Sequence, residues 1–188
     1  MNIGFDLDKI FINTPPFIPK SFIEKMYKKR DNGALVYRIP GRVEQVIRNI
    51  SHMPMFRPAI KANLNFLKHL PKENNKYYLI SSRFKFLEKR TQNLIQKNRL
   101  DKIFDKMFFN FANEQPHVFK NRIINNLKLD YYIDDDLSLL KYVAEHNPKT
   151  KFFWLTQESK KMHLPENIVI SQQLSDIFNK ISKENFSI

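Results

Sequence analysis

Two carboxylates lie close together near the start of the sequence, at the end of an apolar run. Asp6 and Asp8 close the run 3–8. In a strand, side chains two positions apart point to the same side. Two carboxylates about 4 Å apart repel each other by roughly 4 kcal/mol at an effective dielectric constant of about 20, so a proton or a cation must relieve the repulsion. Oxygen ligands of this kind suit Mg²⁺, which keeps several waters and accepts substrate phosphate.

Further polar groups are associated with later apolar runs. Three consecutive aspartates, residues 134–136, come directly after the run 131–133. Ser81 follows the run 77–80, and Lys120 lies at the start of the helical pattern that precedes the acids. In open parallel sheets, ligands bind at the carboxyl ends of the strands. We therefore expect acids, a hydroxyl and an amine to gather at one edge of a sheet.

This set of groups is suited to phosphoryl transfer. A carboxylate beside Mg²⁺ can attack phosphorus and form an aspartyl-phosphate. A second carboxylate can protonate the leaving oxygen and later activate water. A hydroxyl and an ammonium can hold the transferred oxygens. The predicted chemistry is therefore the hydrolysis of a phosphate ester through a covalent intermediate.

The elements that must position these groups alternate along the chain. Six apolar runs are predicted strands: residues 3–8, 77–80, 106–109, 131–133, 151–155 and 168–170. Helical patterns lie between or after them, at residues 84–98, 119–127, 137–146 and 174–181. Strands that alternate with helices predict an α/β fold, with a mostly parallel sheet covered on both faces.

A long segment interrupts this alternation between the first two strands. Seventy-two residues run from 9 to 80, far more than a crossover between parallel strands requires. The segment holds helical patterns near residues 21–30, 42–52 and 57–70. We interpret it as a small, mainly helical insertion after strand one, together with the helix that returns to the sheet. The predicted division is a core of residues 1–13 and 72–188 with a cap of residues 14–71.

The order of the polar groups resembles that of the haloacid dehalogenase-like (HAD) superfamily. Residues 5–14 (FDLDKIFINT) are similar to the opening motif of the family, and residues 79–83 (LISSR) to its second motif. Lys120 lies where the third-motif lysine is expected, and residues 132–136 resemble the fourth motif. The resemblance implies a Rossmann-like, doubly wound, mostly parallel sheet with a small type 1 cap, and a Mg²⁺-dependent phosphatase.

The resemblance also implies a role for individual residues. Asp6 would be the nucleophile and Asp8 the general acid and base. Ser81 would bind the phosphoryl group. Lys120 would steady both the nucleophile and the phosphorylated intermediate.

A magnesium site follows from the same resemblance. Its expected ligands are Asp6, the backbone carbonyl of Asp8, and one of the later acids. Asp135 is the first choice among these acids and Asp134 the second, while Asp136 would orient metal-bound water.

The sequence departs from the family pattern after Asp8. Lys9 stands where the family usually has glycine, and Ile10 where it usually has threonine or valine. Lys9 places a bulky cation where close approach of the backbone is common, which indicates either a change of substrate or a degenerate site. Ser82 offers an alternative for capping the helix at 84–98, which would leave Ser81 for phosphate.

Composition excludes several classes of protein. The 188 residues contain no cysteine, which excludes disulfides and zinc-thiolate sites. No run is long and apolar enough to cross a membrane, and Asp6 and Asp8 interrupt the only candidate for a signal peptide. We expect a soluble, cytoplasmic protein.

The net charge of +13 favours anionic partners such as nucleic acid, phosphorylated metabolites or acidic membranes. The basic residues are spread along a chain rich in Lys, Asn, Ile and Phe, so biased composition explains the charge equally well. Arg38, Arg42 and Arg57 in the insertion are interpreted as solvated, with contact to the substrate as the alternative.

The first functional hypothesis is therefore a Mg²⁺-dependent phosphatase acting on a small phosphorylated metabolite, such as a nucleotide or a sugar phosphate. The alternative is a weakly catalytic or non-catalytic protein of the same fold that binds RNA or another polyanion. A receiver-like signalling domain fits less well, because Asn110 stands where the third strand of such a domain would need an acceptor aspartate.

Overall fold

A six-stranded sheet forms the centre of the protein. The computed structural model describes residues 1–15, 28–31, 34–158 and 162–185. The strand order is β5-β4-β1-β6-β7-β8, and every neighbouring pair is parallel. The strands are β1 (Asn2–Phe5), β4 (Lys76–Ser81), β5 (Lys106–Phe109), β6 (Tyr131–Asp134), β7 (Lys151–Leu155) and β8 (Ile168–Ser171). The predicted α/β fold with a parallel sheet is confirmed.

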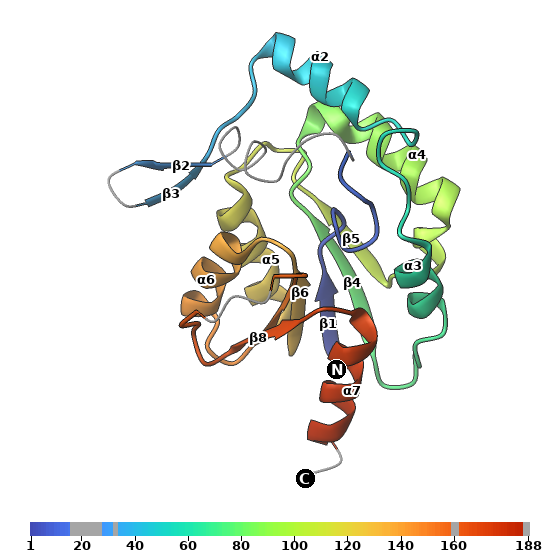
Figure 1. Ribbon diagram of the computed structural model, residues 1–188, viewed down its shortest axis with the longest axis vertical. Helices are drawn as coiled ribbons and strands as arrows, with labels where there is room; N and C mark the ends of the chain where they lie inside the picture. The colour runs from blue at the N-terminus through green and yellow to red at the C-terminus, as the bar shows by residue number, and fades with distance from the viewer. Residues whose placement is uncertain (16–27, 32–33, 159–161, 186–188) are drawn as a thin grey trace.

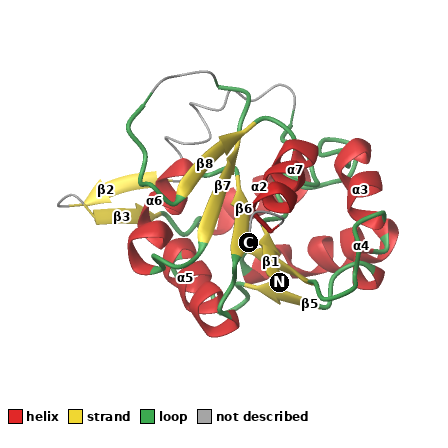
Figure 2. Ribbon diagram, turned by 90° about the horizontal axis from the view of Figure 1, so that it is seen from below, coloured by secondary structure: helices red, strands yellow, loops and turns green. Residues whose placement is uncertain are grey.

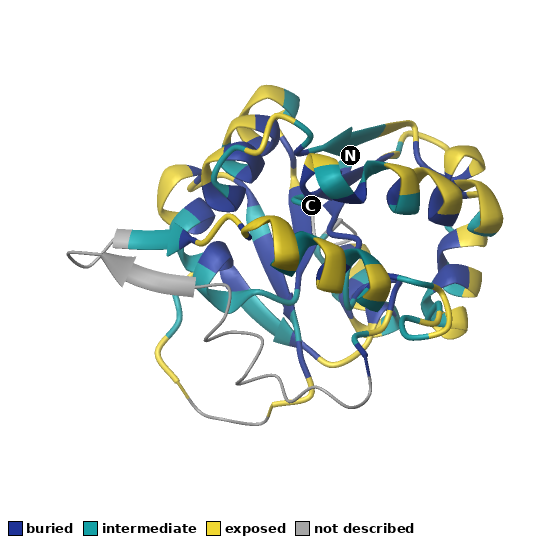
Figure 3. Ribbon diagram, turned by 90° about the horizontal axis from the view of Figure 1, so that it is seen from above, coloured by how far each residue is buried: buried dark blue, intermediate teal, exposed yellow. Residues whose placement is uncertain are grey.

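Helices cover both faces of the sheet (Figures 1 and 2). One face carries α3 (Lys61–Lys68), α4 (Glu88–Asn98) and α7 (Leu174–Asn185), and the other carries α5 (Pro116–Leu127) and α6 (Leu137–His146). Two short 3-10 turns flank α4, at Lys85–Leu87 and Leu100–Lys102. In Figure 3 the central strands are largely buried and the outward faces of the helices are exposed, while the edge strands β5 and β8 are mostly of intermediate burial.

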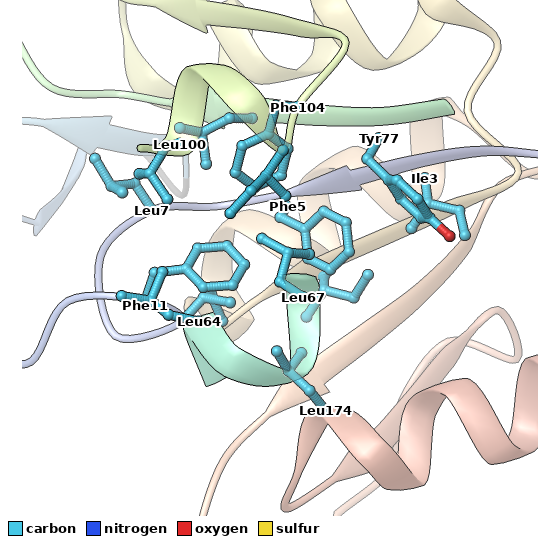
Figure 4. Packing of buried hydrophobic residues seen from close by; sticks show 14 of the residues in the cluster. Ile3, Phe5, Leu7, Phe11, Leu64, Leu67, Tyr77, Leu100, Phe104 and Leu174 are labelled. Atoms are coloured by element: carbon cyan, nitrogen blue, oxygen red, sulfur yellow. The ribbon is translucent and has the colours of Figure 1, made fainter. Parts of the chain in front are cut away.

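Alternation along each strand divides the apolar side chains between two cores. Ile3 and Phe5 of β1 lie in the first core, where Phe5 packs among the rings of Phe11, Tyr77 and Phe104 (Figure 4). Such aromatic packing removes large apolar surfaces from water and fixes the end of β1. The residue after Phe5 is therefore held in a defined place.

Gly4 faces the second core, where the space is tight. A Cβ atom on this residue would lie 2.5 Å from Leu129 Cδ1 and 2.9 Å from Tyr132 Cδ2. Only a residue without a side chain fits here unless these neighbours move, so the packing of Leu129 and Tyr132 over β1 depends on glycine.

The segment after β1 differs in part from the prediction. It contains an antiparallel pair, β2 (Lys28–Asp31) with β3 (Ala34–Tyr37), followed by α2 (Arg42–Ser51). The helix predicted near 21–30 is wrong at residues 28–30, because cross-strand pairing takes their backbone groups; residues 21–27 lie outside the described residues. Tyr37 at the end of this pair is anchored in the second core.

Helix α3 returns the chain to the sheet, as the sequence predicts for residues 57–70. Its buried residues Leu64 and Leu67 pack in the first core beside Phe11. Among the described residues, none of the helices combines the length and hydropathy that a membrane crossing requires.

Candidate active site

Three neighbouring strands deliver polar side chains to one edge of the sheet. Asp6 follows β1 directly, and its backbone N–H donates to the carbonyl oxygen of Ile133 at 2.9 Å. Asp134 ends β6, and Ser81 ends β4 on the other side of β1. Because the strands are parallel and in register, their carboxyl ends meet. This edge is where the sequence predicted the polar groups to gather.

Lys120 joins the acids of β1 and β6. Its Nζ donates to Asp6 Oδ1 and to Asp134 Oδ2, at 2.7 Å each. Tyr132 Oη donates to the same Asp134 oxygen at 3.0 Å. The Lys120 side chain is only 4% exposed, so α5 places a buried ammonium between two buried carboxylates. Such a group is held rigidly, because moving the ammonium away would leave both carboxylates as uncompensated buried charges.

For Lys120 and for Asp6, burial and the neighbouring opposite charge shift the pKa in opposite directions. Burial disfavours the charged form of Lys120, but the carboxylates of Asp134 and Asp6 outweigh it and raise the pKa of the ammonium well above its ordinary value. Burial raises the pKa of Asp6 to about 8, although the Lys120 ammonium opposes the shift. A further cation near Asp6 would relieve the cost of ionising this carboxyl.

The acids fit a divalent metal ion. Asp6, Asp134 and Asp135 each offer one carboxylate oxygen, and these atoms lie within 4.8 Å of one another. Hard oxygen ligands with room for water match the preference of Mg²⁺. Both oxygens of Asp134 already accept hydrogen bonds from the protein, Oδ2 as above and Oδ1 from the backbone N–H of Asp136. Asp135 is thus the more available of the two later acids.

Asp136 has a structural task of its own. Its Oδ1 accepts the backbone N–H groups of Ser138 and Leu139, which caps the start of α6. Its Oδ2 accepts the Tyr37 hydroxyl at 2.8 Å. This carboxylate therefore connects the insertion to the core. Its expected contact with metal-bound water stays a prediction.

Asp8 does not belong to the group formed by Asp6, Asp134 and Asp135. Its carboxylate instead accepts hydrogen bonds from two arginines. Arg83 donates from Nε to Oδ2 at 2.8 Å and from Nη2 to Oδ1 at 2.7 Å, and Arg57 Nη1 adds a third bond to Oδ1 at 3.1 Å. Desolvation raises the pKa of Asp8, but the charge of Arg83 and its hydrogen bonds, with help from Arg57, hold this pKa well below its ordinary value. Asp8 is a carboxylate in this arrangement.

The position of Arg57 corrects the sequence interpretation. Its side chain is 10% exposed and reaches from the insertion to the core, so it is not a solvated surface group. Arg38, in contrast, is half exposed and pairs with Glu44, and Arg42 is exposed.

Lys9 adopts a backbone conformation that suits glycine. Its φ of 59° lies in the left-handed region, which side chains rarely adopt. Its Nζ lies 2.5 Å from Asp135 Oδ2, so the cation at the atypical position contacts a candidate metal ligand.

A cavity of about 220 Å³ opens above these groups. The acids and Lys120 form one side of it, and Arg38, Arg48, His52 and Arg57 reach it from the insertion. Apolar side chains complete the wall: Tyr37, Phe84, Phe86, Leu87, Pro116 and Leu139. The cavity is lined by both charged and apolar side chains, which suits a small molecule that carries an anionic group.

Solved structures share this architecture. A protein from Bacteroides fragilis described as a haloacid dehalogenase-like hydrolase aligns over 94% of this chain and 98% of its own, with a TM-score of 0.62 and 16% identity. The β-phosphoglucomutase of Pyrococcus sp. strain ST 04 aligns over 97% and 99%, with a TM-score of 0.60 and 13% identity. The chain has the haloacid dehalogenase-like fold.

A third protein with the haloacid dehalogenase-like fold was solved with ligands bound. The D,D-heptose 1,7-bisphosphate phosphatase of B. bronchiseptica, complexed with magnesium and phosphate, aligns over 98% of this chain and 99% of its own, with a TM-score of 0.53 and 13% identity. No family model matches the sequence, and no curated protein matches it at a significant level.

The two serines after β4 differ in their surroundings. Ser81 Oγ accepts the backbone N–H of Arg83 at 3.4 Å, and Ser81 is not among the described residues that line the cavity. Ser82 lines the cavity, and its buried Oγ has no hydrogen-bond partner among the described residues. Neither serine caps the following helical segment, which begins after Phe84 without a side-chain cap.

Sequence reasoning assigned Ser82 a structural role and did not consider Arg83. The signal for both is local, because a strand that ends at Ser81 points the next side chains toward the ligand edge. A strand end cannot be located to a single residue from an apolar run alone.

Proposed function

We propose that the protein is a Mg²⁺-dependent phosphatase that hydrolyses a small phosphorylated metabolite through an aspartyl-phosphate on Asp6. The observation that carries this proposal is the fixed position of the Asp6 carboxylate. Lys120 holds one oxygen of Asp6 at 2.7 Å, and the candidate metal ligands Asp134 and Asp135 lie beside it. A nucleophile that lines the cavity, is held by Lys120 and lies beside acids that would bind a metal ion suits phosphoryl transfer.

The covalent step uses the other oxygen of Asp6. This oxygen attacks phosphorus, a new bond forms between them, and the bond from phosphorus to the leaving oxygen breaks. Asp8, once protonated, gives its proton to that leaving oxygen. Water then attacks the aspartyl-phosphate, Asp8 accepts the proton of the water, and phosphate leaves with Asp6 restored. Lys120 stabilises negative charge at Asp6 throughout.

Asp8 is ionised in the arrangement described above, and it must take up a proton to act as an acid. A phosphate group that enters the cavity competes with Asp8 for Arg57, because guanidinium groups bind phosphate and carboxylate in the same way. Once Arg57 turns to the substrate and the negative charge of the phosphate lies near Asp8, the pKa of Asp8 rises toward its ordinary value. We infer that substrate binding prepares the acid.

Asp6 and Asp135 would hold Mg²⁺, with Asp134 as a further ligand and the Asp8 backbone carbonyl as the fourth candidate. When bound, the ion supplies positive charge to the oxygens of the transferred group. Ser82 lines the cavity, and its buried Oγ has no hydrogen-bond partner among the described residues; it is proposed as the phosphoryl ligand in preference to Ser81.

The proposed substrate class rests on the residues that line the cavity and on proteins of similar structure. Two of the reported neighbours are named for phosphorylated sugars, and the cavity offers apolar and aromatic side chains beside its charged groups. A sugar phosphate or a nucleotide fits this combination. Binding of RNA or another polyanion has no specific observation in its favour, because Lys9, Arg57 and Arg83 each pair with an acid of the site.

The proposal is tested by phosphate release from p-nitrophenyl phosphate and from a panel of sugar phosphates and nucleotides, with and without Mg²⁺. Asp6→Asn is expected to abolish release while the protein stays folded. Asp101→Asn is the matched control, because Asp101 is half exposed, pairs with Lys102 at 3.8 Å and does not line the cavity. Full activity of Asp6→Asn would remove the proposal.

A further inference from the structure

Lys9 occupies a turn that is built tightly against the site. Its backbone N–H donates to the carbonyl oxygen of Ile12 at 2.7 Å, and the N–H of Phe11 donates to Leu7 at 3.0 Å. These bonds hold Lys9 at a φ of 59°, a conformation that glycine adopts without steric cost. The side chain therefore leaves the turn in a fixed direction, toward the acids at the end of β6.

The ammonium of Lys9 meets the most available acid of the metal-binding group. Nζ lies 2.5 Å from Asp135 Oδ2, and the two side chains are 26% and 16% exposed. Asp135 itself is anchored, because Trp154 Nε1 donates to its backbone carbonyl oxygen at 2.9 Å. Of the two Asp135 oxygens, one is thus engaged by a cation that the chain supplies.

The charges at the site are largely balanced by the chain itself. When all three are ionised, Asp6, Asp134 and Asp135 carry three negative charges, and Lys120 and Lys9 supply two positive ones. Lys120 is buried between its two partners and cannot leave. Lys9 has a flexible four-carbon stem and a partly exposed side chain, so its ammonium can exchange Asp135 for water. Of these two lysines, Lys9 is the one placed to respond to an incoming ion.

We propose that Lys9 is a built-in counter-ion of Asp135, which a divalent cation must displace in order to bind. The proposal concerns the metal of the proposed phosphatase, but the binding equilibrium it describes is independent of catalysis. Two cations cannot share the same carboxylate edge without strong repulsion. The site therefore exchanges between a form with lysine on Asp135 and a form with the ion on Asp135, and the exchange weakens the affinity for the ion.

The test is a direct measurement of metal binding. Mg²⁺ is titrated by calorimetry, and Mn²⁺ by the loss of its free-ion paramagnetic resonance signal, into the wild-type chain and the Lys9→Met variant. Methionine keeps a long side chain at the turn but removes the charge. We expect the dissociation constant of Lys9→Met to fall by at least about tenfold, a change of roughly 1.4 kcal/mol, whereas Lys9→Arg retains the weak binding.

Two further variants make the outcome decisive. Lys151→Met is the matched control, because Lys151 also forms an ion pair, with Glu184, but does not line the cavity; its affinity should equal that of the wild type. Lys9→Gly replaces Lys9→Met if the latter does not fold, as judged by circular dichroism.

Equal affinity of the wild type and the neutral Lys9 variants overturns the inference, as does an absence of binding in all of them. Failure of the proposed phosphatase would be seen separately, as missing phosphate release by a protein that binds metal as expected.

Discussion

Arg83 grips Asp8 through two parallel hydrogen bonds, from Nε to Oδ2 at 2.8 Å and from Nη2 to Oδ1 at 2.7 Å. The guanidinium is itself buried, so the pair is shielded from water on one side and keeps its geometry. Bidentate pairs of this kind are stronger and more directional than single ion pairs. The clamp fixes the candidate acid and base of the reaction and sets its charge.

Removal of the clamp should move the acid limb of the pH–rate profile to higher pH. Arg83 lowers the pKa of Asp8, so in Arg83→Gln this pKa rises toward the ordinary value of about 3.9. Asp8 then loses its negative charge at a higher pH, and the water-activating step fails earlier as the solution is acidified. The measurement is the pH dependence of kcat, which includes hydrolysis of the aspartyl-phosphate, between about pH 3 and about pH 8. Arg122→Gln, which removes an exposed arginine paired with Glu114, should leave the limb in place.

The two serines after β4 provide a matched pair of variants. Ser82→Ala removes the partnerless hydroxyl of a residue that lines the cavity, and we expect kcat/KM to fall by on the order of 10²-fold, as for other donors aimed at a reacting oxygen. Ser81→Ala removes a hydroxyl that accepts a bond from Arg83 and should change kcat/KM little. Steady-state kinetics of both variants on one phosphorylated substrate shows which serine binds the phosphoryl group. The opposite order of effects would restore Ser81 as the phosphoryl ligand.

Metal affinity should depend on pH through Asp135. Burial raises the pKa of this carboxyl to about 6, although Lys9 opposes the shift. Metal ligands must be deprotonated. The affinity for Mg²⁺ therefore falls as pH falls through this pKa, by up to about tenfold per pH unit, in addition to the loss from protonation of Asp6, whose pKa burial raises to about 8. Calorimetric titrations at several pH values measure the effect. A Mg²⁺ affinity that stays constant between about pH 5 and about pH 8 would contradict this prediction.

The close approach at Gly4 should be visible in stability. Gly4→Ala forces a methyl group against Leu129 and Tyr132, and overpacking of this kind costs about 1–3 kcal/mol. The free energy of unfolding in urea measures the loss. Gly41→Ala is the control, because nothing lies within 4 Å of the added Cβ and its φ of −68° suits any residue. A Gly4→Ala protein as stable as Gly41→Ala would show that the second core relaxes freely.

Much of the fold and the centre of the site follow from local patterns. The strands are continuous apolar runs because both of their faces are buried, and such runs are visible in the sequence. Asp6 and Asp134 meet because each ends one of two adjacent parallel strands. Lys120 could be placed near them because it lies on the helix that leads into β6. These relationships depend on strand ends, which the sequence marks.

Other parts of the site depend on contacts between distant segments. Arg57 reaches Asp8 across 49 positions of the chain, and its partner is determined by how the insertion folds back over the core. The pairing of β2 with β3 was missed because backbone hydrogen bonding between strands outweighs a weak helical pattern. The cation of Lys9 was noticed in the sequence, but its contact with Asp135 depends on the turn that directs its side chain.

The most direct test of the account is to trap phosphate on Asp6. The wild type and Asp8→Asn, in which hydrolysis of the intermediate is slowed, are mixed with p-nitrophenyl phosphate and Mg²⁺, quenched in acid and digested for mass spectrometry. The account predicts a phosphoryl group on the peptide that contains Asp6, more abundant in Asp8→Asn and absent from Asp6→Asn. Steady release of phosphate with Asp6 unmodified, or by the Asp6→Asn variant, would contradict it.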